Sequence, residues 1–345
     1  MKKEVIPIMF CFDTNYVIPA STAFYSLMEH ANKKYYYKFY ILHSDITKKQ
    51  QEKLKLTLID FKDNVDLTFI NMNDRFNDIW NKLKSKVHFS KEVLYKLLVS
   101  SLFPNYDKLI VSDVDVLFLD DISKSYFSIN SKDKYYLSGV RQIGFLKNFN
   151  SVYANNFTAD EISLLNGFCG GYIVFNLRYM RETNIEEKFI QYLSTNYDKI
   201  IYAEQDVLNI CCDGKVKYLS LNYCTCTYMW DFYKTDHDFS TDSVYSKNEL
   251  KSAMKNPIQL HYASTEKPWK YVDTIKSEEW FKYIVKTPFL REYLEYLPSN
   301  IVIKKNELPK KKNTLKNIFL YIKRNPLFLF KKDFYKKVIS KLVNK

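Results

Sequence analysis

Two acidic residues stand inside one of the most apolar stretches of the chain. Asp113 and Asp115 belong to the run VSDVDVLF at 111–118, and residues two apart on a strand face the same side. Buried carboxylates cost free energy unless they are paired or bind a metal. The spacing therefore predicts that both carboxylates approach one divalent cation, such as the ion that accompanies a diphosphate. A strand end that reaches solvent is the alternative interpretation.

A histidine and a lysine near residue 265 add to this chemistry. His261 opens the segment HYASTEKPW, in which Lys267 is followed by proline and tryptophan. An imidazole beside two carboxylates makes a mixed nitrogen and oxygen site that suits Mn²⁺ better than Mg²⁺, with Mg²⁺ as the alternative. Lys267 can neutralise a phosphate as a point charge. Taken alone, His261 could equally be a histidine satisfied within the core.

Together the two motifs resemble the family 8 retaining glycosyltransferases, which include glycogenin and bacterial lipopolysaccharide galactosyl- and glucosyltransferases. The resemblance covers about residues 5–275. It implies a GT-A-type nucleotide-diphospho-sugar transferase fold. It also implies that Asp113, Asp115 and His261 ligate Mn²⁺ bound to the diphosphate of a UDP-sugar, and that Lys267 contacts a phosphate.

A polar segment after the first expected strand is similar to the family's Asp-x-Asn-Tyr motif, which holds uracil and ribose. Here it reads DTNY, and the resemblance implies that Asp13, Asn15 and Tyr16 contact the nucleotide. Polar groups at the carboxyl end of a strand are also where an α/β sheet binds nucleotides. We expect Ser112 and Val114, which flank the first carboxylate, to contact the same ligand.

The segments matched to the donor sugar depart from the family pattern. Lys96 stands where the family usually has an arginine that bridges the donor sugar and the metal ligands, so the planar fork is lost while the charge is kept. The segment FCGG places Cys169 where the family has asparagine, followed by Gly170 and Gly171 at the sugar. Cys224 stands where an asparagine is frequent. The resemblance therefore supports a UDP-sugar and a metal more firmly than any particular sugar.

The segment EQDVLN at 204–209 resembles the family's Asp-Gln-Asp-x-x-Asn motif. It implies catalytic positions at Glu204, Gln205 and Asp206, with Gln205 near the anomeric carbon. An amide is a poor nucleophile, so a covalent intermediate at Gln205 is disfavoured. We expect attack on the leaving-group face through an oxocarbenium-like state, with Gln205 and Glu204 positioning the sugar.

Alternating strands and helices are expected to position these residues. Apolar runs and helical periodicity predict a helix that Ser90 caps and Pro104 ends, and a single strand that carries both aspartates. The alternation predicts an α/β fold with a single mostly parallel central sheet and helices on both faces. The expected strands are 5–12, 37–43, 65–71, 108–119, 171–177 and 258–262, and the expected helices are 20–29, 47–60, 90–102, 185–197 and 204–210.

The positive charge is concentrated at the C-terminus. The net charge is +13, and residues 301–345 hold 14 Lys/Arg and 2 Asp/Glu, which leaves 13 − 12 = +1 for the other 300 residues. A nearly neutral body argues against a nucleic-acid-binding fold. The end of the chain has apolar stripes at helical spacing among lysines, which is typical of a helix on an anionic bilayer. A helix packed on the body, or RNA binding, are the alternatives.

These patterns predict three parts: a GT-A catalytic domain at 1–280, a helical connector at 281–309 and a basic amphipathic membrane-surface tail at 310–345. No apolar stretch approaches the length of a membrane span, and the start fits a first strand better than a signal peptide. Six cysteines without a C-x-x-C pair favour free thiols. We expect a cytoplasmic protein attached peripherally to the inner face of the cell membrane.

The predicted function is metal-dependent transfer of a hexose, galactose or glucose, from a UDP-sugar to a lipopolysaccharide or other surface-glycan acceptor. One alternative is a catalytically impaired member that acts as a UDP or membrane-surface binding module, which the departures at Lys96, Cys169 and Cys224 allow. Another is a phosphotransferase of the haloacid dehalogenase type, whose opening motif DVDV at 113–116 matches. Its later lysine and acidic motifs are not suitably placed. No pattern predicts an oligomeric state.

Overall fold

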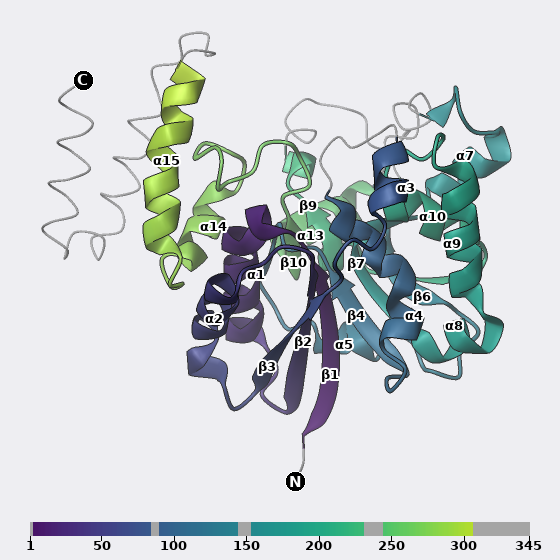
Figure 1. Cartoon of the computed structure of the whole chain (residues 1–345), viewed down its shortest axis with the longest axis horizontal. Coiled ribbons are helices and arrows are strands. Elements are labelled where there is room, and N and C mark those ends of the chain that lie inside the picture. Colours follow the sequence, from purple (N-terminus) through teal and green to yellow (C-terminus); the bar gives the residue numbers. More distant parts are fainter. Residues whose placement is uncertain (1–2, 84–89, 144–152, 231–243, 306–345) are drawn as a thin grey trace, which may run out of the picture.

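The computed structural model describes residues 3–83, 90–143, 153–230 and 244–305, and it is built around one large twisted sheet (Figure 1). Within these residues the sheet has seven strands in the order β3-β2-β1-β4-β7-β6-β8. No helix among them is long and apolar enough to cross a membrane. The strands are β1 (Glu4–Cys11), β2 (Tyr35–His43), β3 (Val65–Asn71), β4 (Lys108–Ser112), β6 (Leu137–Arg141), β7 (Phe168–Asn176) and β8 (Val216–Leu219).

The first half of the sheet is parallel and the second half is mixed. β1 pairs in parallel with β2 and β4, and β2 pairs in parallel with β3. β7 is antiparallel to both β4 and β6, whereas β6 and β8 are parallel. A mostly parallel sheet is thus confirmed. The strand direction reverses between β4 and β7, and β4 ends just before the residues expected to bind metal.

Helices cover both faces of the sheet, as predicted (Figure 1). Alternate residues of β1 enter two separate hydrophobic clusters: Ile8 and Phe10 pack with α1, while Met9 packs toward the opposite face with α9 and α10. The helices are α1 (Val17–His30), α2 (Lys48–Thr57), α3 (Asn77–Lys82), α4 (Val99–Leu102), α5 (Ser123–Tyr126), α7 (Ala159–Leu165), α8 (Leu177–Thr183), α9 (Ile185–Asn196), α10 (Ala203–Cys211), α13 (Lys247–Lys255), α14 (Ser277–Ile284) and α15 (Leu290–Lys305).

The prediction of one strand over 108–119 was wrong. β4 ends at Ser112, and after Asp113 and Asp115 the chain continues as β5 (Val116–Phe118) in a second sheet. In that sheet β5 pairs antiparallel with β10 (Gln259–His261), which is parallel to β9 (Thr225–Cys226). The apolar pattern is continuous because both short strands are buried. The two carboxylates therefore lie at the crossing between two sheets rather than on one strand.

The helix expected to begin at Ser90 also differs from the structure. Residues Lys91–Leu98 form a 3₁₀ helix, η3, which is followed by the short α4. The Ser90 side chain makes no capping hydrogen bond. The Thr47 cap is confirmed, because Thr47 and Gln50 form both hydrogen bonds of a capping box at α2. Three further 3₁₀ segments are η1 (Thr14–Tyr16), η2 (Ile59–Phe61) and η4 (Leu221–Cys224).

The helices after residue 276 pack on the same core as α1. Trp280 of α14 is fully buried, and Tyr293 of α15 is nearly so. Both belong to the hydrophobic cluster that contains Phe24 and Phe39. The division at residue 280 stays a prediction, as does the tail at 310–345, which lies outside the described residues.

Candidate active site

The segment between β4 and β5 is tied by its backbone to both sheets. The N–H of Asp113 donates to the carbonyl of Gly171 on β7 at 3.1 Å, and the N–H of Tyr262, just after β10, donates to the carbonyl of Asp115 at 2.9 Å. These bonds fix the two aspartates at the carboxyl end of β4. That edge of an α/β sheet is the expected place for a ligand.

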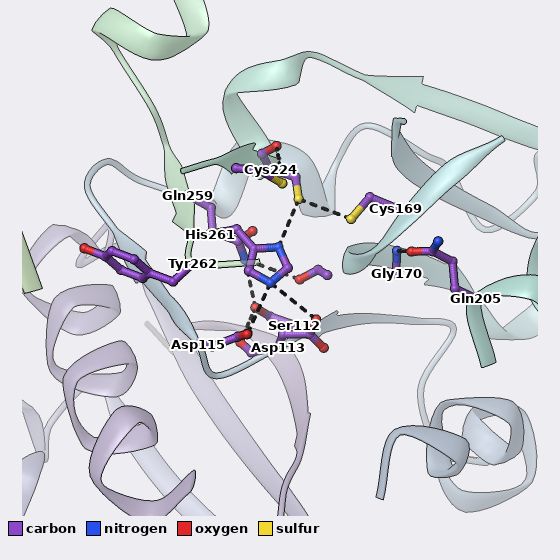
Figure 2. A network of polar contacts seen from close by, with 12 residues as sticks. Ser112, Asp113, Asp115, Cys169, Gly170, Gln205, Cys224, Gln259, His261 and Tyr262 are labelled. Carbon is purple, nitrogen blue, oxygen red and sulfur yellow. Dashed lines mark hydrogen bonds and ion pairs between the residues drawn. The ribbon is translucent and has the colours of Figure 1, made fainter. Parts of the chain in front are cut away.

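The aspartates meet a histidine from a distant part of the chain (Figure 2). Nε2 of His261 lies 3.1 Å from Oδ1 of Asp115 and 3.7 Å from Oδ2 of Asp113. Ligand atoms of all three side chains lie within 4.8 Å of one another. The three predicted metal ligands are therefore brought together, and two carboxylates with an imidazole form a donor set that fits a divalent ion such as Mn²⁺.

Lys96 links this cluster to two other predicted site segments. Its buried ammonium donates to Oδ1 of Asp113 at 2.7 Å, to Oε1 of Glu204 at 2.8 Å and to the carbonyl of Gly170 at 3.0 Å. All three ammonium donors are thus used. Lys96 therefore joins a candidate metal ligand, the glycine segment (Gly170 and Gly171) and the first turn of α10.

Lys267 holds the second aspartate. Its ammonium lies 2.5 Å from Oδ2 of Asp115 and 2.6 Å from the carbonyl of Tyr262. It also lies 5.9 Å from the centre of the Trp269 ring. Each carboxylate of the candidate metal site therefore faces one lysine. Because Lys267 borders the site, it is suited to meet a phosphate there.

The charges of the site shift its pKa values strongly. Burial alone would raise the pKa of Asp115, but the charges of Lys267 and His261 outweigh it and hold this pKa well below the usual range. Burial would lower the pKa of His261, yet the negative charge of Asp115 raises it. Burial also raises the pKa of Glu204 to about 7, against the opposing effect of Lys96.

The three predicted catalytic residues sit in the first turn of α10 and have different environments. Oε1 of Gln205 accepts a hydrogen bond from the N–H of Gly170 at 2.7 Å, which aims this side chain along the glycine segment (Figure 2). Glu204 is buried against Lys96. Asp206 is fully buried; it accepts from Tyr153 at 2.6 Å and from two backbone N–H groups before α10.

A cavity of about 420 Å³ lies against η1 and the start of α1. Asp13, Asn15 and Tyr16, the predicted nucleotide contacts, line it together with Trp269 and Tyr293. Asp13 caps η1 through hydrogen bonds to Asn15, and the Tyr16 and Trp269 rings meet edge to face at 5.9 Å. The structure thus gathers the DTNY and KPW segments around one concave surface.

Ser112 and Val114, also predicted to contact the ligand, are both buried. The Ser112 hydroxyl donates to the carbonyl of Asp113 and accepts from Nε2 of Gln259. In this arrangement the Ser112 side chain supports the turn that carries the aspartates. Its contact with a ligand stays a prediction.

The family model of glycosyl transferase family 8 matches residues 7–273, which is most of the chain. The chain belongs to this family. Two curated relatives are similar over most of their length. The General stress protein A of Bacillus subtilis is 22% identical over 303 residues, with 86% of this chain and 94% of the relative covered. A "Putative glycosyltransferase" of Haemophilus influenzae is 25% identical over 306 residues, with 83% and 85% covered.

Solved structures of glycosyltransferases share the fold of this family 8 chain. The galactosyltransferase LgtC, solved with donor and acceptor sugar analogues, has a TM-score of 0.63 at 19% identity, with 82% of this chain and 96% of LgtC covered. The bifunctional enzyme WbbM has a TM-score of 0.70 at 22% identity, and 86% of this chain is covered. The chain spans about half the length of WbbM, 52%. The GT-A-type fold is thereby confirmed.

Sequence reasoning missed several groups that build the site of this glycosyltransferase. Asn209 holds the start of β7, because its Oδ1 accepts from the N–H of Phe168 at 2.8 Å and its Nδ2 donates to the carbonyl of Phe168 at 3.0 Å. The last residue of the EQDVLN motif was the signal for it. Cys169 and Cys224, noted only as departures, lie next to each other, with sulfurs 3.6 Å apart. No spacing in the sequence indicated that contact.

Proposed function

We propose that this family 8 glycosyltransferase is a metal-dependent retaining enzyme that transfers a hexose from a UDP-sugar to a surface-glycan acceptor. The observation that carries the proposal is the convergence of Asp113, Asp115 and His261, whose ligand atoms lie within 4.8 Å of one another. These residues are 148 positions apart at most (261 − 113 = 148), with the aspartates on the crossing between β4 and β5 and the histidine on β10. Their meeting at the carboxyl end of β4 supports a shared ligand.

Two carboxylate groups and one imidazole would hold the metal, and their chemistry fits Mn²⁺. When bound, the ion would supply positive charge to stabilise the diphosphate as a leaving group. Asp113 and Asp115 are already oriented for this by Lys96 and Lys267. The two carboxylates therefore need little reorganisation when the ion binds.

The nucleotide part of the donor would occupy the cavity lined by Asp13, Asn15 and Tyr16. Asp13 and Asn15 offer hydrogen-bonding groups for ribose and base, while Tyr16 and Trp269 offer ring surfaces. Lys267 donates to Asp115 and lies 5.9 Å from the ring of Trp269, which lines this cavity. A diphosphate bridging the cavity and the carboxylates would meet its ammonium.

The donor sugar would lie over the glycine segment and α10. Gln205 is held by Gly170, its amide nitrogen makes no hydrogen bond with any residue that the structure describes, and Lys96 fixes Glu204. Because an amide is a poor nucleophile, we favour attack by the acceptor on the same face that the diphosphate leaves. In this pathway Gln205 and Glu204 orient the sugar, and the departing diphosphate accepts the proton of the acceptor hydroxyl.

Galactose or glucose is the proposed sugar, and lipopolysaccharide or another surface glycan is the proposed acceptor. The fold similarity to the galactosyltransferase LgtC supports a sugar acceptor in general terms. The basic segment at the end of the sequence supports an acceptor held at an anionic membrane surface. We accordingly propose a cytoplasmic location at the inner face of the cell membrane.

The experiment is release of UDP from a panel of UDP-hexoses, with and without Mn²⁺. We expect Mn²⁺-dependent release from one or two of them, and loss of release in Asp115→Asn. Lys55→Met, on an exposed part of α2, is the matched control and should behave as wild type. Release that is equal with and without Mn²⁺ would contradict the metal dependence. Mn²⁺-dependent UDP binding without release, even with glycan acceptors, would instead favour the binding module.

A further inference from the structure

The imidazole of His261 faces two different donor sets, one on each nitrogen (Figure 2). Nε2 points to the aspartates. Nδ1 lies 3.6 Å from the sulfur of Cys224, and that sulfur lies 3.6 Å from the sulfur of Cys169. Ligand atoms of Cys169, Cys224 and His261 all lie within 4.8 Å of one another. The sulfur side of the ring is not used by the proposed transfer reaction.

Two of the three distances among these atoms match those around a tetrahedral thiophilic ion. With zinc–sulfur bonds of about 2.3 Å and zinc–nitrogen bonds of about 2.0–2.1 Å, neighbouring ligand atoms lie about 3.5–3.8 Å apart. The sulfur–sulfur distance and the distance from the Cys224 sulfur to Nδ1 are both 3.6 Å. Thiolate and imidazole ligands together select zinc and similar soft ions.

We propose that Cys169, Cys224 and Nδ1 of His261 form a second metal site, distinct from the carboxylate site, that binds a thiophilic ion represented by Zn²⁺. Binding replaces the two S–H protons and any proton on Nδ1, which are released to solvent as the metal bonds form. No oxidation takes place, and the ion keeps its charge state.

The surroundings of the cluster suit a bound ion. Cys224 and His261 are buried at 1% and 5% exposure, whereas Cys169 is partly exposed. An ion can therefore enter beside Cys169 and keep a water molecule as its fourth ligand. Cys226, which is buried two residues after Cys224, offers a further sulfur next to those of Cys169 and Cys224.

The second site competes with the first for the same ring. A neutral imidazole has one nitrogen free to bind a metal, so a bond at Nδ1 leaves the proton on Nε2. The Nε2–H group then donates a hydrogen bond to Oδ1 of Asp115, 3.1 Å away. An ion on the sulfurs thus prevents His261 from acting as a metal ligand at the carboxylate site. This consequence rests on the proposed function, whereas the sulfur site does not.

The test is titration of the full chain with Cd²⁺, a spectroscopic probe for Zn²⁺ sites, after chelator treatment and in a phosphine reductant. A cadmium–thiolate bond gives an ultraviolet charge-transfer band that carboxylates do not give. We expect one ion per chain with a band for two thiolates. Cys169→Ser and Cys224→Ser should each weaken binding by at least about tenfold, and the double variant should abolish the band.

Cys211→Ala is the matched control, because Cys211 is a buried thiol on α10 outside the cluster. It should bind as wild type. Thermal melts check that each variant is folded. If the double variant does not fold, the Cd²⁺ affinity of Cys169→Ser, a change at a partly exposed position, decides the test by itself. A band that persists in the double variant, or that is lost in Cys211→Ala, would overturn the site. So would the absence of any band in wild type. Failure of the metal-dependent transfer reaction would leave the band unchanged.

Discussion

His261 packs directly against the backbone of Gly171. A Cβ atom added to Gly171 would lie 2.6 Å from Cε1 and 2.7 Å from Nδ1 of His261, and 3.3 Å from Oδ2 of Asp113. Carbon atoms do not approach that closely, so the imidazole can occupy its place beside the carboxylates only if residue 171 has no side chain. The glycine is part of the candidate metal site although it offers no ligand.

Gly171→Ala should therefore displace the His261 ring and weaken Mn²⁺ binding by about tenfold or more. Electron paramagnetic resonance of free Mn²⁺ during a titration measures this affinity. Gly170→Ala is the matched control, because its Cβ would meet the end of the Glu204 side chain at 3.2 Å and not the ring. Equal Mn²⁺ affinities of wild type and Gly171→Ala would show that His261 is not needed as a ligand.

Lys96→Met should destabilise the fold strongly. The variant removes the ammonium shared by Asp113 and Glu204 and leaves Glu204 buried without its cation, which costs about 3–5 kcal/mol in comparable pairs. Urea denaturation gives the free energy of unfolding. Lys55→Met, which breaks an exposed pair with Glu52, should cost less than about 1 kcal/mol. Similar losses in the two variants would mean that the Lys96 network contributes little.

Asp206 is expected to position α10 rather than to touch the substrate. Asp206→Asn turns one acceptor oxygen into a donor, facing either Tyr153 or the backbone N–H groups of Ile201 and Tyr202, and should cost about 1–3 kcal/mol of stability. Tyr153→Phe should cost about 1 kcal/mol. Below the melting temperature of both variants, UDP release should fall to a similar extent. A loss confined to Asp206→Asn in fully folded protein would instead support its predicted catalytic role.

Removal of residues 310–345 should abolish binding to vesicles that contain anionic lipids, while UDP-sugar hydrolysis is kept. The physical reason is the positive charge of this end of the sequence, which an anionic surface attracts. Sedimentation with anionic and with purely zwitterionic vesicles measures it. Undiminished sedimentation of the truncated chain with anionic vesicles would rule out the tail as the membrane anchor.

Much of the framework could be predicted from local patterns. The strands β1 to β3 and the helix α9 follow apolar runs and periodicities that depend on few neighbours. The Thr47 capping box is local as well. The three metal ligands came from the pairing of a D-x-D segment with a late histidine, and the structure brings them together.

Other features depend on partners that no local pattern encodes. The apolar run at 108–119 could not reveal that Val116–Phe118 pairs with β10 instead of extending β4. Over the eight residues of η3, spacings of three and of 3.6 residues per turn are hardly distinguishable. The contact between Cys169 and Cys224 joins residues 55 positions apart and is created only by the fold.

The most direct test of the account is calorimetric titration of UDP into the protein with and without Mn²⁺. If Asp113, Asp115 and His261 hold the metal that binds the diphosphate, UDP should bind at least about tenfold more tightly with Mn²⁺, an interaction of about 1.4 kcal/mol or more. The difference should vanish in a folded Asp115→Asn variant. UDP affinity that is unchanged by Mn²⁺ in wild type would contradict the account.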